Sequence, residues 1–226
     1  MESDFYYSYS ENDYIYKEQE PFNPGLQLSH FEIEKQLGQN NYSSIYLVKC
    51  KLNNKKYAMK EIKTQIFYNE IQRLLIQKEL YLLKNLNHPH ITTYLSSFYE
   101  KGNFFIIIDY IEGEDLESYF KDKKEKGIYV KEKKIWEIFL QILDGLSYLH
   151  NTEKIIHRNI KPSNILIDKN GNIKITDYGI SAFYKEENII KPNLTTTSSV
   201  KYIKYTTPEI IEGGTYDYKS NIYMLD

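Results

Sequence analysis

Hydrophobic and polar residues alternate in several short runs after residue 30, which is the pattern of half-buried β-strands. A continuous apolar run further along the chain has the length of a buried strand. The alternating runs are 31–34 and 45–48, a polar turn falls at 51–55, the next predicted strand is 57–62, and the continuous run is 104–108. The pattern therefore predicts a sheet in the first part of the chain.

Two longer segments, 66–86 and 133–150, instead carry apolar residues at helical spacing. The second is the clearer, with apolar positions at Ile135, Ile138, Phe139, Ile142, Leu143, Leu146 and Leu149. A strand-rich part (31–109) is thus followed by a helix-rich part (114–226), and this order predicts an α+β fold.

Composition and charge narrow the classes of function. The chain has 226 residues, 41% of them hydrophobic, which is enough for one domain or two small lobes. A net charge of −2 gives no indication of nucleic-acid binding. No run approaches the ~20 apolar residues of a membrane helix, and the N-terminus lacks a signal-peptide pattern. The single cysteine, Cys50, excludes an internal disulfide and favours an intracellular, cytoplasmic location.

Residues 1–29 differ from the rest of the chain. The first twenty hold six acids, one base and five tyrosines, and the turn-rich segment 21–25 follows them. Apolar residues show no period here, so we expect a disordered, acidic, tyrosine-rich tail. The alternative is a docking segment that carries tyrosines.

A carboxylate, Glu79, lies on the apolar stripe of the predicted helix 66–86, between Leu75 and Leu83. A charge in that position is costly unless it is paired. Lys60, on the predicted strand 57–62, is the nearest upstream candidate for such a pair. The alternative is that Glu79 meets water at the edge of the helix.

A second polar pair follows from a predicted hairpin. Asn170-Gly171 is a strong two-residue turn signal between two short apolar strands. A two-residue loop would place Asn164 opposite Asp177, about 5 Å apart. An amide oxygen beside a carboxylate suits Mg²⁺ with a phosphate-bearing ligand. The alternative is an ordinary polar end of a hairpin.

Four motifs occur in an order and spacing that resemble a eukaryotic Ser/Thr protein kinase domain over residues 31–226. They are Tyr57-Ala58-Met59-Lys60 with Glu79 nineteen residues later, His157-Arg158-Asn159-Ile160-Lys161-Pro162-Ser163-Asn164, Asp177-Tyr178-Gly179 and Thr207-Pro208-Glu209. The resemblance implies a bilobal fold with a five-stranded antiparallel sheet and helix C in 31–109. A hinge at 109–114 and a helical lobe from 115 that stops at the start of helix F would complete it.

The resemblance also implies roles for individual residues, with ATP and Mg²⁺ as ligands. Lys60, held by Glu79, would contact the α- and β-phosphates, while Asn164 and Asp177 would carry Mg²⁺. Lys161 matches the Ser/Thr-specific form of the catalytic loop. The nucleotide would be bordered by Leu37, Gly38, Ile45, Ala58, Leu166, the gatekeeper Ile108, the backbone of Asp109 and Ile111, and Asp115 at the ribose. Leu83, Tyr94, His157 and Tyr178 match the regulatory hydrophobic column.

The sequence departs from this family at its catalytic centre. Asn159 stands where the family has the catalytic Asp, and an amide is essentially not a base, although base catalysis is typically worth ~10²–10⁴ in rate. Only Gly38 remains of the glycine-rich loop, where Ser43 adds a side chain near the phosphates. Lys201-Tyr202 replaces the usual Gly-Thr. We expect impaired or lost phosphoryl transfer; the alternatives are a weakly active kinase and a non-functional fragment of a kinase gene.

The end of the sequence carries further departures. Asn221 stands where the family has an Asp that braces the catalytic loop, and Glu209 lacks its usual arginine partner. We expect the helix 135–149 to leave an apolar face exposed, with marginal stability, aggregation or a protein partner that covers this face as the alternative consequences. A phosphate on the cluster 195–199 could pair with Arg158; the alternative is a mobile polar loop. The protein substrate is left open, and no nucleic-acid or membrane partner is expected.

Overall fold

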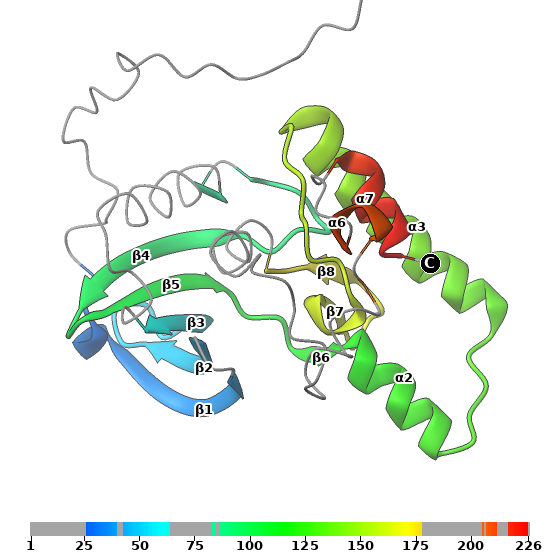
Figure 1. Ribbon diagram of the computed structural model, residues 1–226. Coiled ribbons are helices and arrows are strands. Elements are labelled where there is room, and N and C mark those ends of the chain that lie inside the picture. Colours follow the sequence, from blue (N-terminus) through cyan, green and yellow to red (C-terminus); the bar gives the residue numbers. More distant parts are fainter. Residues whose placement is uncertain are drawn as a thin grey trace, which may run out of the picture.

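The computed structural model describes residues 26–39, 43–63, 83–84, 86–177, 205, 207–211 and 217–225. Its first part is a five-stranded antiparallel sheet with the strand order β1-β2-β3-β5-β4, which confirms the predicted sheet (Figure 1). The strands are β1 (Phe31–Gln39), β2 (Ser43–Cys50), β3 (Lys56–Lys63), β4 (Tyr94–Glu100) and β5 (Asn103–Asp109).

The second part combines a small sheet with helices. Its strands are β6 (Gly113–Asp115), β7 (Ile165–Asp168) and β8 (Ile173–Ile175), and its α-helices are α2 (Leu116–Glu125), α3 (Glu132–Ser147), α6 (Pro208–Ile211) and α7 (Tyr218–Tyr223). Short helical turns add η2 (Leu28–His30), η4 (Tyr148–Thr152) and η5 (Pro162–Asn164). Figure 1 shows the small sheet between the five-stranded sheet and α3, so the α+β class is confirmed.

The two faces of the five-stranded sheet contribute to different cores, because alternate side chains of a strand point to opposite faces. The outer face carries the first cluster, namely Phe31, Val48, Cys50, Met59, Phe98, Phe105 and Ile107. The inner face adds Ile62, Phe104 and Ile106 to a larger core that also contains residues of α3, β7 and β8. The inner face therefore looks towards the second part of the chain.

The predicted N-terminal tail and first helix lie mostly outside the described residues, which exclude 1–25 and 64–82. Leu26 and Leu28 pack against the outer-face cluster, and the Leu28 N–H donates to Glu100 Oε2 at 2.7 Å. The described residues before Phe31 therefore pack against the outer face of the sheet.

Helix α3 shows the predicted amphipathic pattern. Ile138, Ile142 and Leu146 are buried in the larger core, whereas Ile135 (48%), at the N-terminal end of the same stripe, and Trp136 (53%) and Leu140 (59%), on another side of the helix, are exposed. The helix thus presents apolar side chains to solvent, as the sequence analysis expects.

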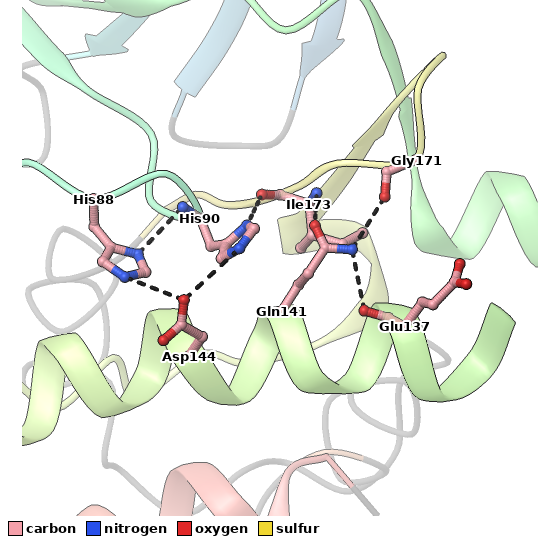
Figure 2. Close-up of polar contacts among 7 residues, drawn as sticks. All are labelled: His88, His90, Glu137, Gln141, Asp144, Gly171 and Ile173. Carbon is pink, nitrogen blue, oxygen red and sulfur yellow. Dashed lines mark hydrogen bonds and ion pairs between the residues drawn. The ribbon is translucent and has the colours of Figure 1, made fainter. Parts of the chain in front are cut away.

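Helix α3 also fixes the segment that leads into β4 (Figure 2). His88 Nε2 and His90 Nε2 lie 3.5 and 3.8 Å from the same Asp144 carboxylate oxygen. Gln141 accepts the Ile173 N–H at 3.0 Å, and the ring nitrogen Nδ1 of His90 is 3.0 Å from the Ile173 carbonyl. One helix therefore positions both this segment and β8.

The predicted register of the β7–β8 hairpin is wrong by one residue. The pairs are Ile165 with Ile175, Leu166 with Lys174, and Ile167 with Ile173. The Asp168 N–H donates to the Asn172 carbonyl at 3.0 Å, so three residues, 169–171, form the turn. The Asp168 carboxylate selects this loop, because it accepts the backbone N–H groups of residues 170 and 172 at 2.8 Å each, and Gly171 takes the left-handed conformation (φ 86°). Consequently Asn164 pairs through its carbonyl with the N–H of Thr176, at 3.0 Å, and not with Asp177.

The close packing of β6 on β7 generates a stability prediction. A Cβ on Gly113 would lie 2.0 Å from the carbonyl oxygen of Ile167, whereas a Cβ on Gly38 would meet nothing within 4 Å. Gly113→Ala should therefore lower the free energy of unfolding by about 1–3 kcal/mol, and the control Gly38→Ala should not. Urea unfolding measures both; equal midpoints for the two variants would contradict the packing described.

Candidate functional site

The site is centred on an ion pair that joins the two parts of the molecule. Lys60, on the inner face of β3, places Nζ 2.5 Å from Asp177 Oδ1. Lys60 is 8% exposed, and a buried ammonium needs such a partner. Asp177 follows β8 in the left-handed backbone conformation (φ 63°), an uncommon one for a residue other than glycine. The sequence analysis expected both residues in one site, and the structure brings them together.

The Asp177 carboxyl is held in its charged form. Burial by itself would raise the pKa of Asp177, but the charge and hydrogen bond of Lys60, with smaller contributions from His157 and Lys161, together outweigh burial. The pKa therefore lies below its ordinary value. A charged carboxylate is a ligand that Mg²⁺ prefers.

Asn164 is the second predicted metal ligand, and its amide is oriented by the loop that precedes it. Its Nδ2 donates to the carbonyl of Asn159 at 2.9 Å, so Oδ1 is the atom left to bind a cation. The carbonyl of Asn164 accepts the Thr176 N–H, one residue before Asp177. The structure thus places Asn159 and Asn164 beside the strand end that carries Asp177.

These donors fit Mg²⁺. One carboxylate and one amide oxygen are typical of a magnesium ion that completes its shell with water and substrate phosphates. Within the described ranges there is no group of three or more His, Cys, Asp or Glu residues that could hold a metal by itself. A metal here would therefore need oxygens from a phosphate-bearing ligand.

The loop that carries Asn159 is supported from α7. Arg158 has a left-handed backbone (φ 64°), and its N–H donates to Asn221 Oδ1 at 3.0 Å. Asn221 is fully buried, and its Nδ2 lies 2.8 Å from His150 Nε2. The bracing position predicted for Asn221 is confirmed, with an amide in the place of a carboxylate.

His157 supports the same loop from within the core. It is fully buried; Nε2 lies 3.0 Å from the Thr176 carbonyl, and Nδ1 accepts the Asn159 N–H at 3.2 Å. Burial lowers the pKa of His157 to about 4, because a low-dielectric environment disfavours the charged imidazolium. His157 is therefore neutral at physiological pH and acts as a hydrogen-bonded support.

The strand register shows on which face of each sheet the predicted nucleotide-lining residues lie. Ala58 pairs with Ile108, and Ile45 pairs with Lys60, so these four lie on the inner face of the five-stranded sheet. Leu166 pairs with Lys174 and with Asp115 on the small sheet. Gly38 pairs with Ile45, and Leu37 beside it in β1 is 42% exposed.

The other predicted residues have defined places. The Asp115 carboxylate caps α2 by accepting the Ser118 N–H at 2.9 Å and its hydroxyl at 2.8 Å. Ile111 lies between β5 and β6, and Lys161 directly precedes η5. Glu209 accepts a hydrogen bond from the Ser220 hydroxyl at 2.7 Å, which supplies the partner that the sequence did not identify.

Some predicted positions lie outside the described residues, among them Glu79, Tyr178, Lys201-Tyr202 and the cluster 195–199. Leu83 belongs to the larger core, and Tyr94 packs against it. No helix of the described segments is long and apolar enough to cross a membrane.

Sequence reasoning missed Lys174. Its Nζ donates to the Ile91 carbonyl at 2.9 Å and lies 3.6 Å from Asp109 Oδ2. The sequence signal that could have identified this lysine is its place between Ile173 and Ile175, which are both fully buried in β8. Such a lysine either reaches solvent or finds a specific partner, and here it finds one.

Comparisons with known proteins agree with this geometry. The family model "Protein kinase domain" matches residues 31–225. Mitogen-activated protein kinase kinase SIPKK of Nicotiana tabacum is 34% identical over 91% of this chain and 55% of its own length. Mitogen-activated protein kinase kinase 2 of Arabidopsis thaliana is 34% identical (91% and 53%), and Serine/threonine-protein kinase Nek6 of Oryza sativa subsp. japonica is 32% identical (88% and 35%). The chain therefore spans about half, or less, of the length of these relatives.

Acid conditions should destabilise the fold through His157. Its pKa falls from 6.5 in the unfolded chain to about 4 in the folded one, so between these values only the unfolded state takes up the proton. Relative to His157→Gln, the wild type should lose on the order of 3 kcal/mol of unfolding free energy between pH 7.5 and pH 4. Denaturant unfolding across this range measures the difference; parallel pH profiles for the two proteins would contradict the prediction.

Proposed function

Because the chain belongs to the protein kinase family and resembles its Ser/Thr members, we propose that it binds Mg·ATP between its two sheets and transfers phosphate poorly or not at all. The observation that carries this proposal is the Lys60–Asp177 ion pair, which stands beside a loop with Asn159 in the catalytic position. Protein kinases normally bind ATP and Mg²⁺. In this chain, residues 31–109 and 115–225 would form the two lobes and 109–114 the hinge.

The described residues suit each part of the nucleotide. The Lys60 ammonium would hold phosphate oxygens, and Asn164 Oδ1 with the Asp177 carboxylate would hold Mg²⁺. When bound, the metal neutralises charge on the phosphates. The inner-face residues Ala58 and Ile108 supply apolar surface for the base.

Asn159 is the reason to expect little transfer. The loop holds its backbone in place through Asn164 and His157, so the position itself is built. An amide there can accept a hydrogen bond from a substrate hydroxyl, but it is essentially unable to take the proton. We therefore propose a nucleotide-binding domain in which phosphoryl transfer is slow, because residue 159 lacks the carboxylate that would accept the proton.

A weakly active Ser/Thr kinase is the second candidate. The retained loop favours it, since Asn221 still accepts the Arg158 N–H and Lys161 still stands two residues after Asn159. Phosphoryl transfer through a loose transition state depends mainly on positioning and electrostatics, so a positioned loop without a base retains some rate.

We further propose that the protein acts in the cytoplasm and that another protein surface covers the exposed side of α3. The buried thiol of Cys50 suits a reducing compartment. The exposed side chains Ile135, Trp136 and Leu140 are the apolar surface that such a partner would bury.

Binding of Mg·ATP should depend on Lys60. A ligand at about a hundred times its Kd stabilises the folded state by about 2.7 kcal/mol, so Mg·ATP should raise the melting temperature measurably. Lys60→Met should abolish the shift. Lys56→Met is the matched control, since Lys56 lies on the same strand but pairs at the surface with Glu34, 2.6 Å away. No shift in the wild type, or an undiminished shift in Lys60→Met, would refute nucleotide binding at this site.

Restoring the carboxylate should restore transfer. Asn159→Asp should raise the transfer of labelled γ-phosphate to casein by ~10²–10⁴. Asn151→Asp adds the same charge on η4 and should have no effect. If the wild type transfers phosphate and Lys60→Met abolishes this transfer, the result would favour a weakly active kinase. An unchanged rate in Asn159→Asp would show that more than the base is missing.

A further inference from the structure

A second lysine–aspartate contact links the two sheets, with its charges exchanged relative to the first. Lys60 of the five-stranded sheet reaches Asp177 after β8, whereas Asp109 at the end of β5 faces Lys174 of β8 at 3.6 Å. Both partners of the second contact are largely covered, with side chains 27% and 21% exposed. This ion pair is therefore more buried than the ion pairs at the surface of the described part of the chain.

Asp109 is fixed on a second side by the segment before β4. Its Oδ1 accepts the Thr93 N–H at 2.7 Å, and its own N–H donates to the Thr93 carbonyl at 3.0 Å. Lys174 Nζ donates to the Ile91 carbonyl at 2.9 Å, two residues earlier. The Ile91–Thr93 segment and Lys174 thus enclose the Asp109 side chain, and the segment itself bonds to β8 through Thr92 and Ile175.

The carboxylate needs these partners. Burial raises the pKa of Asp109, while the Thr93 N–H and Lys174 act in the opposite direction and favour the charged form. Among the described residues, Lys174 is the only cation that forms an ion pair with this partly buried carboxylate, so removing the ammonium would leave it unpaired. Turning towards water would then move the Asp109 backbone, because side chain and backbone are both tied to Thr93.

We propose that Lys174 is a positioning residue of the nucleotide site: by holding Asp109 it sets where the hinge backbone meets the base. This inference rests on the proposed function, together with the expectation from the family resemblance that the backbone of Asp109 and Ile111 meets the base. Lys174 itself would not contact the nucleotide. Its effect should therefore appear in the affinity for the base and not in the affinity for the phosphates.

A double-mutant cycle tests the proposal in the full chain. Adenosine and Mg·tripolyphosphate serve as probes for the base and phosphate subsites, and ligand-observed NMR titration at a temperature where all variants are folded gives Kd. The variants are Asp109→Asn, which can still accept the Thr93 N–H, Lys174→Met and the double variant. Lys169→Met is the matched control, because Lys169 joins the same hairpin to the same hinge through Glu112 at 3.0 Å but is 72% exposed.

Each single variant should weaken adenosine binding by about threefold to tenfold, and the double variant should be no weaker than the worse single one. Affinity for Mg·tripolyphosphate should stay within about twofold, since that probe does not meet the hinge, and Lys169→Met should match the wild type for both probes. If the Lys174–Asp109 pair only stabilised the fold, the variants would lower the melting temperature. They would not show a selective, non-additive loss of adenosine affinity.

The outcomes of this experiment distinguish a failure of the positioning role of Lys174 from a failure of the proposed nucleotide site. If the wild type binds both probes and Lys174→Met leaves adenosine binding unchanged, or if the losses of the single variants add, the positioning role is overturned while the nucleotide site stands. If the wild type binds neither probe, the proposed function is wrong and the positioning role falls with it.

Discussion

The ion pair between Lys60 and Asp177 is the constraint on which the architecture of the site depends. A lysine on the inner face of a sheet needs a compensating charge, and here the charge comes from a residue more than a hundred positions later. The strand register places Lys60 beside Ala58 on the face that looks towards the small sheet, and the left-handed backbone of Asp177 follows directly after β8. One interaction thus ties the first sheet to the second and defines where an anion and a cation would meet.

Around this pair, neutral amide side chains and a backbone carbonyl make the hydrogen bonds that hold the loop of Asn159. Asn221 accepts the Arg158 N–H, and the Asn159 carbonyl accepts the Asn164 amide. Each of these hydrogen bonds needs only an acceptor oxygen in the right place. An asparagine side chain or a backbone carbonyl supplies that oxygen as well as a carboxylate does. Proton acceptance at position 159 is the one task that an amide does not perform. The hydrogen bonds that hold this loop therefore do not require a carboxylate at position 159 or 221.

Much of the fold could be predicted from sequence where one physical signal dominates. Period-two alternation identified β1 and β2, and period-3.6 spacing identified α3, because burial on one face controls those segments. Strand β4 gave no such signal, since its buried positions include Ser96 and Ser97, whose polarity hides the pattern. The β7–β8 register was wrong because the Asp168 side chain, and not the Asn-Gly pair, decides the length of the loop. The site itself was predicted as a set of residues, but the role of Lys174 depends on contacts with Ile91 and Asp109 that sequence spacing does not reveal.

The most direct test of the central claim is a crystal structure of the protein grown with Mn²⁺ and a non-hydrolysable ATP analogue, with the metal located by its anomalous signal. The account predicts a Mn²⁺ peak at Asn164 and Asp177, with the triphosphate on Lys60 and the base against the inner face of the five-stranded sheet. A well-ordered structure at saturating ligand in which the Lys60–Asp177 pair is unchanged and neither metal nor nucleotide lies between the two sheets would contradict it.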